Sequence, residues 1–199
     1  VIGIMFRWST GAPTAIYATL RMLIQLLLIG YVLVYIFETD QPEFIMVILV
    51  IMLTVASWIA IRPLQKKQPQ MYMNSFLSIS IGSILILTLV IQIVIDIEPW
   101  FSPRYVVPLA GMIISSAMNT VSLAAERFQS EYDKKTPYIE ARRIALRVSL
   151  IPIINSLFAV GLVALPGMMT GQILSGVSPL IAAQYQIVVM TMLFSASAW

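Results

Sequence analysis

Five small or polar residues between positions 111 and 126 are spaced four, four, three and four residues apart. They are Gly111, Ser115, Asn119, Ser122 and Glu126. On an α-helix this spacing places all five on one face. In an apolar helix such a stripe can pack against another helix, including one from a second copy of the chain, or it can line a path for a solute. Both readings stay open, and one stripe can serve both at a dimer axis.

Arg21 and Gln25 lie one helical turn apart in another apolar stretch. An arginine inside a membrane span is costly, so it is expected to face the bundle interior, water or an ion-pair partner. Glu126 would be such a partner. Near a membrane surface, however, a long arginine side chain can also snorkel to the interface. The residues alone leave an ion-paired role and a snorkelling role open.

The segment from Pro166 to Gly176 is rich in Gly and Met and carries no charge. It predicts a broken elbow, which is either a simple external turn or an outer gate or re-entrant segment. Gln172 offers an amide without the cost of a charge. Met168 and Met169 are soft thioethers that can adapt to a substrate or contact a soft metal, although most methionines of a membrane chain face lipid or fill gaps. No metal site is predicted from these residues.

A charged segment extends over residues 126–147. It is either a solvated loop or a docking surface for a cytoplasmic partner. Its charged residues are Glu126, Arg127, Glu131, Asp133, Lys134, Lys135, Glu140, Arg142, Arg143 and Arg147.

The composition shows whether these residues lie in water or in a lipid bilayer. Apolar residues make up 59% of the chain, charged residues only 11%, and the mean hydropathy is +0.91. A soluble domain of this size could not bury so much apolar surface, so the chain is an integral membrane protein. Cysteine and histidine are absent from the 199 residues, which excludes disulfides, the usual zinc sites and Cys or His nucleophiles within them. No Walker-type phosphate-binding loop is present either, so this segment does not hydrolyse ATP in that way.

Long apolar runs predict an all-α fold, a polytopic transmembrane helix bundle forming one domain over residues 1–199. A spanning helix needs about 20 apolar residues. About six stretches qualify, at residues 16–37, 43–61, 73–95, 104–125, 144–165 and 179–199. The elbow separates the last two, and charged loops are expected at 62–72 and 128–143. The chain starts without methionine and is expected to be a fragment, with Val1–Phe6 as the end of an earlier helix.

Basic residues predict the orientation, because Lys and Arg concentrate in cytoplasmic loops. With residues 1–15 in the cytoplasm, eleven of the twelve basic residues fall on the cytoplasmic side and only Arg104 falls outside. The inner set is Arg7, Arg21, Arg62, Lys66, Lys67, Arg127, Lys134, Lys135, Arg142, Arg143 and Arg147. The outer side carries the acids Glu38, Asp40, Glu43, Asp96 and Glu98. The basic charge therefore reflects topology and not nucleic-acid binding.

An ordered set of short motifs resembles the FetB-type permeases, the membrane subunits of an iron-export ABC transporter, to which plant aluminium-tolerance subunits are similar. The most specific motif is the run LPGMMTGQIL at residues 165–174. The others, in order, are Leu20-Arg21-Met22, Glu98-Pro99-Trp100, Pro103-Arg104-Tyr105, Gly111-Met112, Met118-Asn119, Glu126-Arg127-Phe128 and Asn155-Ser156. Compared with that family, the chain lacks most of a helix before Arg7, and its cytoplasmic segment 129–141 is short and has no glycine.

The resemblance implies a permease subunit that exports iron or a related metal or solute by alternating access in a bacterial inner membrane. Its partners would be a cytoplasmic ABC ATPase subunit, a second permease copy and the lipid bilayer. ATP would bind the ATPase, and no cofactor is expected on this chain. The predicted transport-pathway residues are Arg21, Gln25, Ser115, Asn119, Asn155, Met168, Met169 and Gln172, and the predicted ATPase-coupling residues are Glu126, Arg127, Glu140, Arg142 and Arg143. Two alternatives remain, an autonomous channel or secondary transporter and a non-transporting membrane scaffold.

Overall fold

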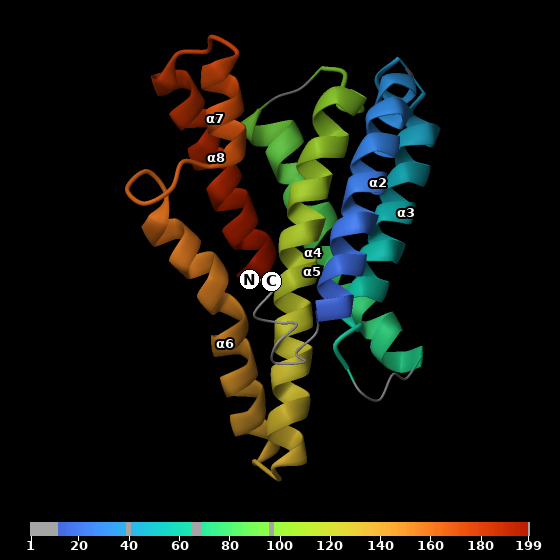
Figure 1. The fold of residues 1–199 in the computed structure, drawn as a ribbon, viewed down its shortest axis with the longest axis vertical. Coiled ribbons are helices and arrows are strands. Elements are labelled where there is room, and N and C mark those ends of the chain that lie inside the picture. Colours follow the sequence, from blue (N-terminus) through green and yellow to red (C-terminus); the bar gives the residue numbers. More distant parts are fainter. Residues whose placement is uncertain (1–11, 39–40, 65–68, 96–97, 199) are drawn as a thin grey trace. The chain divides into compact units, whose positions relative to one another are not determined.

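The structure, a computed structural model, describes residues 12–38, 41–64, 69–95 and 98–198. Within these ranges every regular element is a helix, which confirms the all-α prediction (Figure 1). The elements are α2 (Ala12–Phe37), α3 (Pro42–Ala60), α4 (Pro69–Leu89), the π-helix η1 (Val90–Val94), α5 (Pro103–Asp133), α6 (Tyr138–Ala159), α7 (Gly167–Leu174) and α8 (Pro179–Ala198). The chain divides into two compact units, residues 1–41 and 42–199, and α2 is the described helix of the first.

Helix α5 is the centre of the second unit, where it contacts α3, α4, α6 and α8. Small residues let α3, α4 and α5 approach closely. Ala60 and Ala110 are fully buried and pack in one cluster with Ile79. A second cluster, formed around Ile113, joins α5 to α3, α4 and α8. Apolar packing of this kind, together with close backbone approach, is what holds helices together in lipid.

Within the described ranges, five helices are long and apolar enough to cross a membrane, where about six were predicted for the chain. They are Ala15–Phe37, Pro42–Ala60, Pro69–Val94, Pro103–Asp133 and Pro179–Ala198. The predicted span 144–165 is absent from this set because α6 begins six residues earlier, among charged residues, and ends six residues earlier, at Ala159. Its polar first half and its early end both shorten the apolar stretch.

The break after α6 is a compact turn over residues 160–166. Gly161 adopts a φ of +81°, a conformation that glycine accepts without steric cost. The amides of Leu162, Val163 and Ala164 all donate to the carbonyl of Ala159, at 3.3, 2.9 and 3.2 Å. The turn therefore satisfies much of its own backbone, as an interruption at membrane depth requires.

Helix α7 follows this break and fills most of the segment predicted as an elbow. Its eight residues are about 12 Å long, which is too short to cross a bilayer. Figure 1 shows α6, the turn and α7 continuing in the same general direction before α8 returns. The prediction of a continuous helix to residue 165 is therefore wrong. The chain forms two helices here, α6 and α7, because Gly161 and Pro166 flank a backbone-bonded turn.

The predicted loop at 128–143 is also wrong, because helices occupy nearly all of it. Helix α5 continues to Asp133 and α6 starts at Tyr138, which leaves only residues 134–137 between them. Helix α5 is about 46 Å long, whereas the hydrocarbon layer is about 30 Å thick. The two helices therefore form a hairpin, residues 126–147, that extends past the other connections of this unit (Figure 1).

Several predicted charges, Arg7, Asp40, Lys66, Lys67 and Asp96, lie outside the described residues, as does the predicted helix end at Val1–Phe6. The orientation of the chain in the membrane therefore stays a prediction from the distribution of its Lys and Arg residues.

Filling a close helix contact should destabilise this unit. Ala60→Leu adds volume at a fully buried position between α3, α4 and α5, and we expect it to lower the free energy of unfolding by about 1–3 kcal/mol. The matched control is Thr54→Leu on the exposed side of the same helix. Thermal unfolding of the detergent-solubilised protein measures both. An equal Tm for the two variants would contradict the packing described here.

Candidate functional site

A cavity of about 820 Å³ lies between α5, α7 and α8, at the end of the bundle opposite the α5–α6 hairpin. We call it the α5–α7–α8 cavity. It is lined by Ile95, Glu98, Arg104, Tyr105, Pro108, Leu109, Met112, Met168, Gln172, Val177, Tyr185, Val188 and Val189. The predicted pathway residues Met168 and Gln172 are among them, so the structure brings these two to one site.

Two residues of the lining each have an oxygen atom that lacks its usual hydrogen-bond donor. The Oε1 atom of Gln172 is buried and accepts no hydrogen bond within the described chain. No ion pair joins Glu98 to Arg104 in the same part of the structure. Pro108 has no amide hydrogen, so the carbonyl of Arg104 loses its usual helical donor. The lining thus contains one cation, Arg104, one anion, Glu98, and uncharged acceptors.

A second space continues along α5 toward the middle of the bundle. This α5–α8 groove has a volume of about 500 Å³. It is lined by Pro108, Gly111, Met112, Ser115, Ser116, Asn119 and Leu193. Pro108 and Met112 line both spaces, so the groove adjoins the α5–α7–α8 cavity.

The groove contains three of the five residues of the predicted polar stripe of α5, which are Gly111, Ser115 and Asn119. Ser115 and Asn119 are exposed along it, while the opposite face of α5 is buried in the core. Ser116, beside them, binds α8: its hydroxyl is 2.8 Å from the hydroxyl of Ser197 and donates to the carbonyl of Leu193 at 3.2 Å. These bonds hold α8 against the wall of the groove.

Other predicted pathway residues lie elsewhere. Asn155 is on the exposed side of α6 and lines neither the cavity nor the groove. Met169 lines a separate cavity with the buried Gln186, because neighbouring residues of a helix point about 100° apart. Arg21 and Gln25 belong to the other unit of the chain, so their role in the path stays a prediction.

The sequence did not predict that Glu98, Arg104, Tyr105 and Tyr185 belong to this cavity. One signal was available for Arg104. It is the single basic residue of the chain that falls on the predicted outer side, so the topology rule does not explain its presence. No comparable signal distinguished the tyrosines from membrane-interface aromatic residues.

The tip of the α5–α6 hairpin is organised around Glu131, which is nearly buried. Its carboxylate binds Arg127 Nη2 at 2.8 Å and Lys134 Nζ at 3.4 Å, and it accepts a hydrogen bond from the Thr136 hydroxyl at 3.1 Å. The Thr136 amide also donates to the Glu131 carbonyl at 3.2 Å. The predicted coupling residue Arg127 therefore supports the tip.

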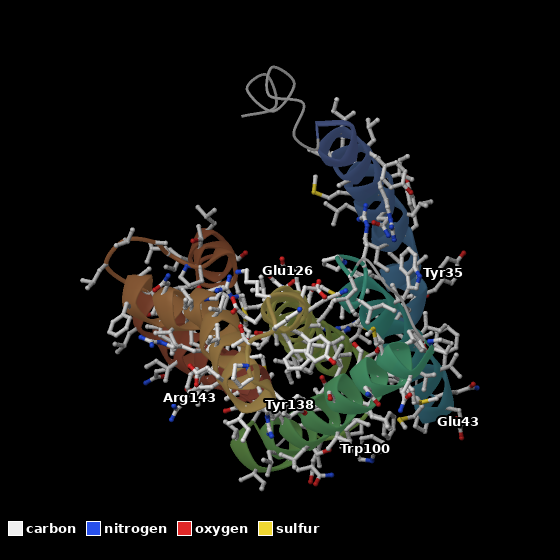
Figure 2. The ribbon with its side chains drawn as sticks, turned by 90° about the horizontal axis from the view of Figure 1, so that it is seen from below. Tyr35, Glu43, Trp100, Glu126, Tyr138 and Arg143 are labelled. Atoms are coloured by element: carbon white, nitrogen blue, oxygen red, sulfur yellow. The ribbon has the colours of Figure 1, made fainter. Side chains whose placement is uncertain are left out.

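Aromatic residues cross the hairpin beside this cluster. Phe128 stacks on Tyr132 and meets Tyr138 edge to face, with ring centroids 6.1 and 5.7 Å apart. The outer sides of both tyrosines stay exposed, and Ile139 is 81% exposed. Figure 2 views the molecule from this end and shows Tyr138 and Arg143 on α6 and Glu126 on α5. Of the predicted coupling residues, Glu126, Glu140, Arg142 and Arg143 are exposed.

Apolar helices long enough to cross a membrane, a span interrupted near one end and a polar-lined groove define a polytopic α-helical membrane protein. The chain belongs to the family described as "Uncharacterised protein family (UPF0014)", whose sequence model matches residues 4–145 and 137–199. The resemblance stated from the sequence is thereby confirmed.

Named relatives cover most of the chain. It is 38% identical to UPF0014 membrane protein slr1647 of Synechocystis, over 85% of this chain and 71% of that one. It is 32% identical to "Probable iron export permease protein FetB" of Escherichia coli, over 96% and 74%. It is also 32% identical to "Protein ALUMINUM SENSITIVE 3" of Arabidopsis thaliana, over 92% and 71%. No solved structure matches the chain.

Removing the Glu131 charge should loosen the hairpin tip. In Glu131→Gln the cluster keeps its shape but loses its anion, while Arg127 and Lys134 remain partly exposed and screened by water. We expect amide hydrogen exchange at Lys135 and Thr136 to accelerate roughly tenfold. Asp133→Asn, on the exposed side of the same turn, is the control. Unchanged exchange in Glu131→Gln would show that backbone bonds alone order the tip.

Proposed function

We propose that this chain is the membrane-spanning permease subunit of an ABC transporter. It would export iron or a related metal or solute, with ATP bound and hydrolysed by a separate cytoplasmic subunit. The observation that carries the proposal is the pair of adjoining spaces along α5, one open near the predicted outer end and one reaching the middle of the bundle. The relative named as an iron export permease supports the choice of cargo.

The pathway would run along α5, from the groove at Asn119 and Ser115 to the α5–α7–α8 cavity. Uncharged amides and hydroxyls suit such a path because they replace part of a solute's hydration without holding it tightly. Helix α7 would act as the outer gate. It packs on α8 between two turns and contributes Met168 and Gln172 to the cavity.

The α5–α6 hairpin would receive the ATPase. Its tip is held by Glu131, and it presents apolar and charged side chains together, as a protein docking surface requires. Helix α6 then runs without interruption from this surface to the break at residue 160. A displacement of the hairpin would be carried along α6 to the turn that precedes the gate helix.

A second permease copy would complete the path. Ser115 and Asn119 are exposed along the groove, and polar side chains at membrane depth are expected to face protein or water and not lipid. We therefore place the homodimer contact beside this groove, in a multi-pass assembly of the bacterial plasma membrane. In this arrangement one stripe serves both packing and transport.

The decisive experiment follows ATP-dependent accumulation of radioactive iron in inside-out vesicles. The vesicles carry the full-length permease, with and without its candidate ATPase. We expect accumulation only when both chains and ATP are present. Transport by the permease alone would support a channel or secondary transporter instead. An assembled pair that accumulates no iron would reject iron as the cargo.

The docking proposal predicts that an exposed apolar side chain of the hairpin is needed for assembly. Ile139→Ala should reduce co-purification of the ATPase with the permease about tenfold, because it removes a fully accessible contact group. Leu162→Ala removes an equally exposed apolar side chain at the break after α6, and it should leave assembly unchanged. Equal recovery of the ATPase from both variants would reject the hairpin as the docking site.

Two asparagines test where the path lies. Asn119 lines the groove and Asn155 lines neither space. Asn119→Leu should lower the ATP-driven iron flux at least tenfold, since it replaces an amide in the path with an apolar group of similar size. Asn155→Leu should keep more than half of the flux. Both variants are first checked for assembly with the ATPase by size-exclusion chromatography. The reverse order of effects would place the path along α6.

A further inference from the structure

We infer that the α5–α7–α8 cavity recognises an organic carboxylate, free or as the ligand shell of a metal ion, and not a bare metal cation. The inference rests on the proposed function and names the class of solute that its outer site would take. Four features of the cavity carry it: size, charge, unpaired acceptors and apolar lining.

The cavity is too large for a hydrated ion. An octahedral metal ion with six waters occupies about 180 Å³, taking about 30 Å³ for each water. The cavity measures about 820 Å³. Its volume falls instead in the range of roughly 300–1,000 Å³ that is usual for sites of small organic molecules.

The charged residues of the lining, Arg104 and Glu98, cancel one another, so the lining does not carry the net negative charge that would attract a bare cation. Arg104 places a permanent positive charge at the cavity, and its planar guanidinium is suited to bind a carboxylate through two parallel hydrogen bonds. Among the described residues, no group of three or more acidic, histidine or cysteine side chains could hold a metal ion. Glu98 is the acidic residue in the lining, and it can face a donor or the metal centre of a complex.

Two acceptors in the same wall require hydrogen-bond donors on the solute. The Gln172 Oε1 atom is buried without a partner, and a buried acceptor of this kind costs free energy until a donor reaches it. The carbonyl of Arg104 lacks its helical donor because residue 108 is proline. A hydroxyl or amine on an organic acid would meet this need. Oxygens of this kind also coordinate hard metal ions, so they fit an organic acid or its metal complex and do not by themselves exclude an ion.

The rest of the lining is apolar or aromatic. Leu109, Val188 and Val189 form part of the wall, and Tyr105 and Tyr185 each add a ring and a hydroxyl. Contact with an apolar wall does not stabilise a hydrated ion, because the ion would give up water molecules and receive no polar ligand in return. It does gain from the carbon surface of an organic solute.

Equilibrium dialysis of the full-length permease–ATPase complex in detergent tests the inference. The probes are ¹⁴C-citrate, which is a hydroxy acid, the same citrate with ferric iron, and ⁵⁵Fe²⁺ held reduced without a chelator. We expect citrate to bind, and iron to bind only together with it. Arg104→Gln should weaken citrate binding roughly tenfold, because the charge-assisted pair is lost.

The matched control is Arg62→Gln, which removes an exposed arginine from the turn after α3 and should leave citrate binding unchanged. Gln172→Leu should weaken citrate binding severalfold through loss of the buried acceptor. Absence of citrate binding even at millimolar concentrations, or equal citrate affinity in Arg104→Gln and the native complex, would overturn the inference. Binding of ferrous iron without citrate would overturn it too.

Vesicle transport separates this inference from the proposed function. If ⁵⁵Fe accumulates with ATP but ¹⁴C-citrate does not, the proposal of an ABC permease is supported and the inference of an organic solute is rejected. If the complex binds citrate through Arg104 but accumulates neither label with ATP, the inference of an organic solute is supported and the proposal of an ABC permease is rejected. Accumulation of both labels, reduced together by Arg104→Gln, is the result we expect.

Discussion

The backbone hydrogen bond is the constraint on which the rest of this structure depends. In hydrocarbon an unpaired amide or carbonyl has no water to bind, so the chain must form helices or close its interruptions on themselves. The turn after α6 meets this requirement, since three of its amides share the Ala159 carbonyl. Because that turn is locally satisfied, the span can be divided into α6 and α7. The division frees a short helix to line a cavity.

Helix α5 contributes to the core, to the groove and to the hairpin. One side carries small and branched residues that pack into both apolar clusters, and another side carries the Ser115–Asn119 stripe along the groove. Its length also exceeds the hydrocarbon thickness, so the same helix continues into the hairpin at Glu131. The core, the proposed path and the proposed docking surface therefore share one helix, and α6 beside it would carry the proposed coupling to the gate.

The candidate site could be predicted only in part from the sequence. Helical periodicity correctly grouped Ser115 with Asn119, because residues four apart share a face whatever surrounds the helix. It could not separate Met168 from Met169, which line different cavities. Nor could it separate Asn119 from Asn155. Which face of a helix meets a cavity depends on the crossing of its neighbours, and that is not encoded in local spacing.

The sequence by itself determined the membrane class, the all-helical fold, the approximate spans and the family, because hydropathy and short motifs are local properties of the chain. Tertiary structure alone decided that the apparent loop at 128–143 is a helical hairpin and that the elbow contains α7. It also decided that Arg104, Tyr105 and Tyr185 share one cavity with Gln172. These residues come from three different helices, so only the packing of those helices could bring them together.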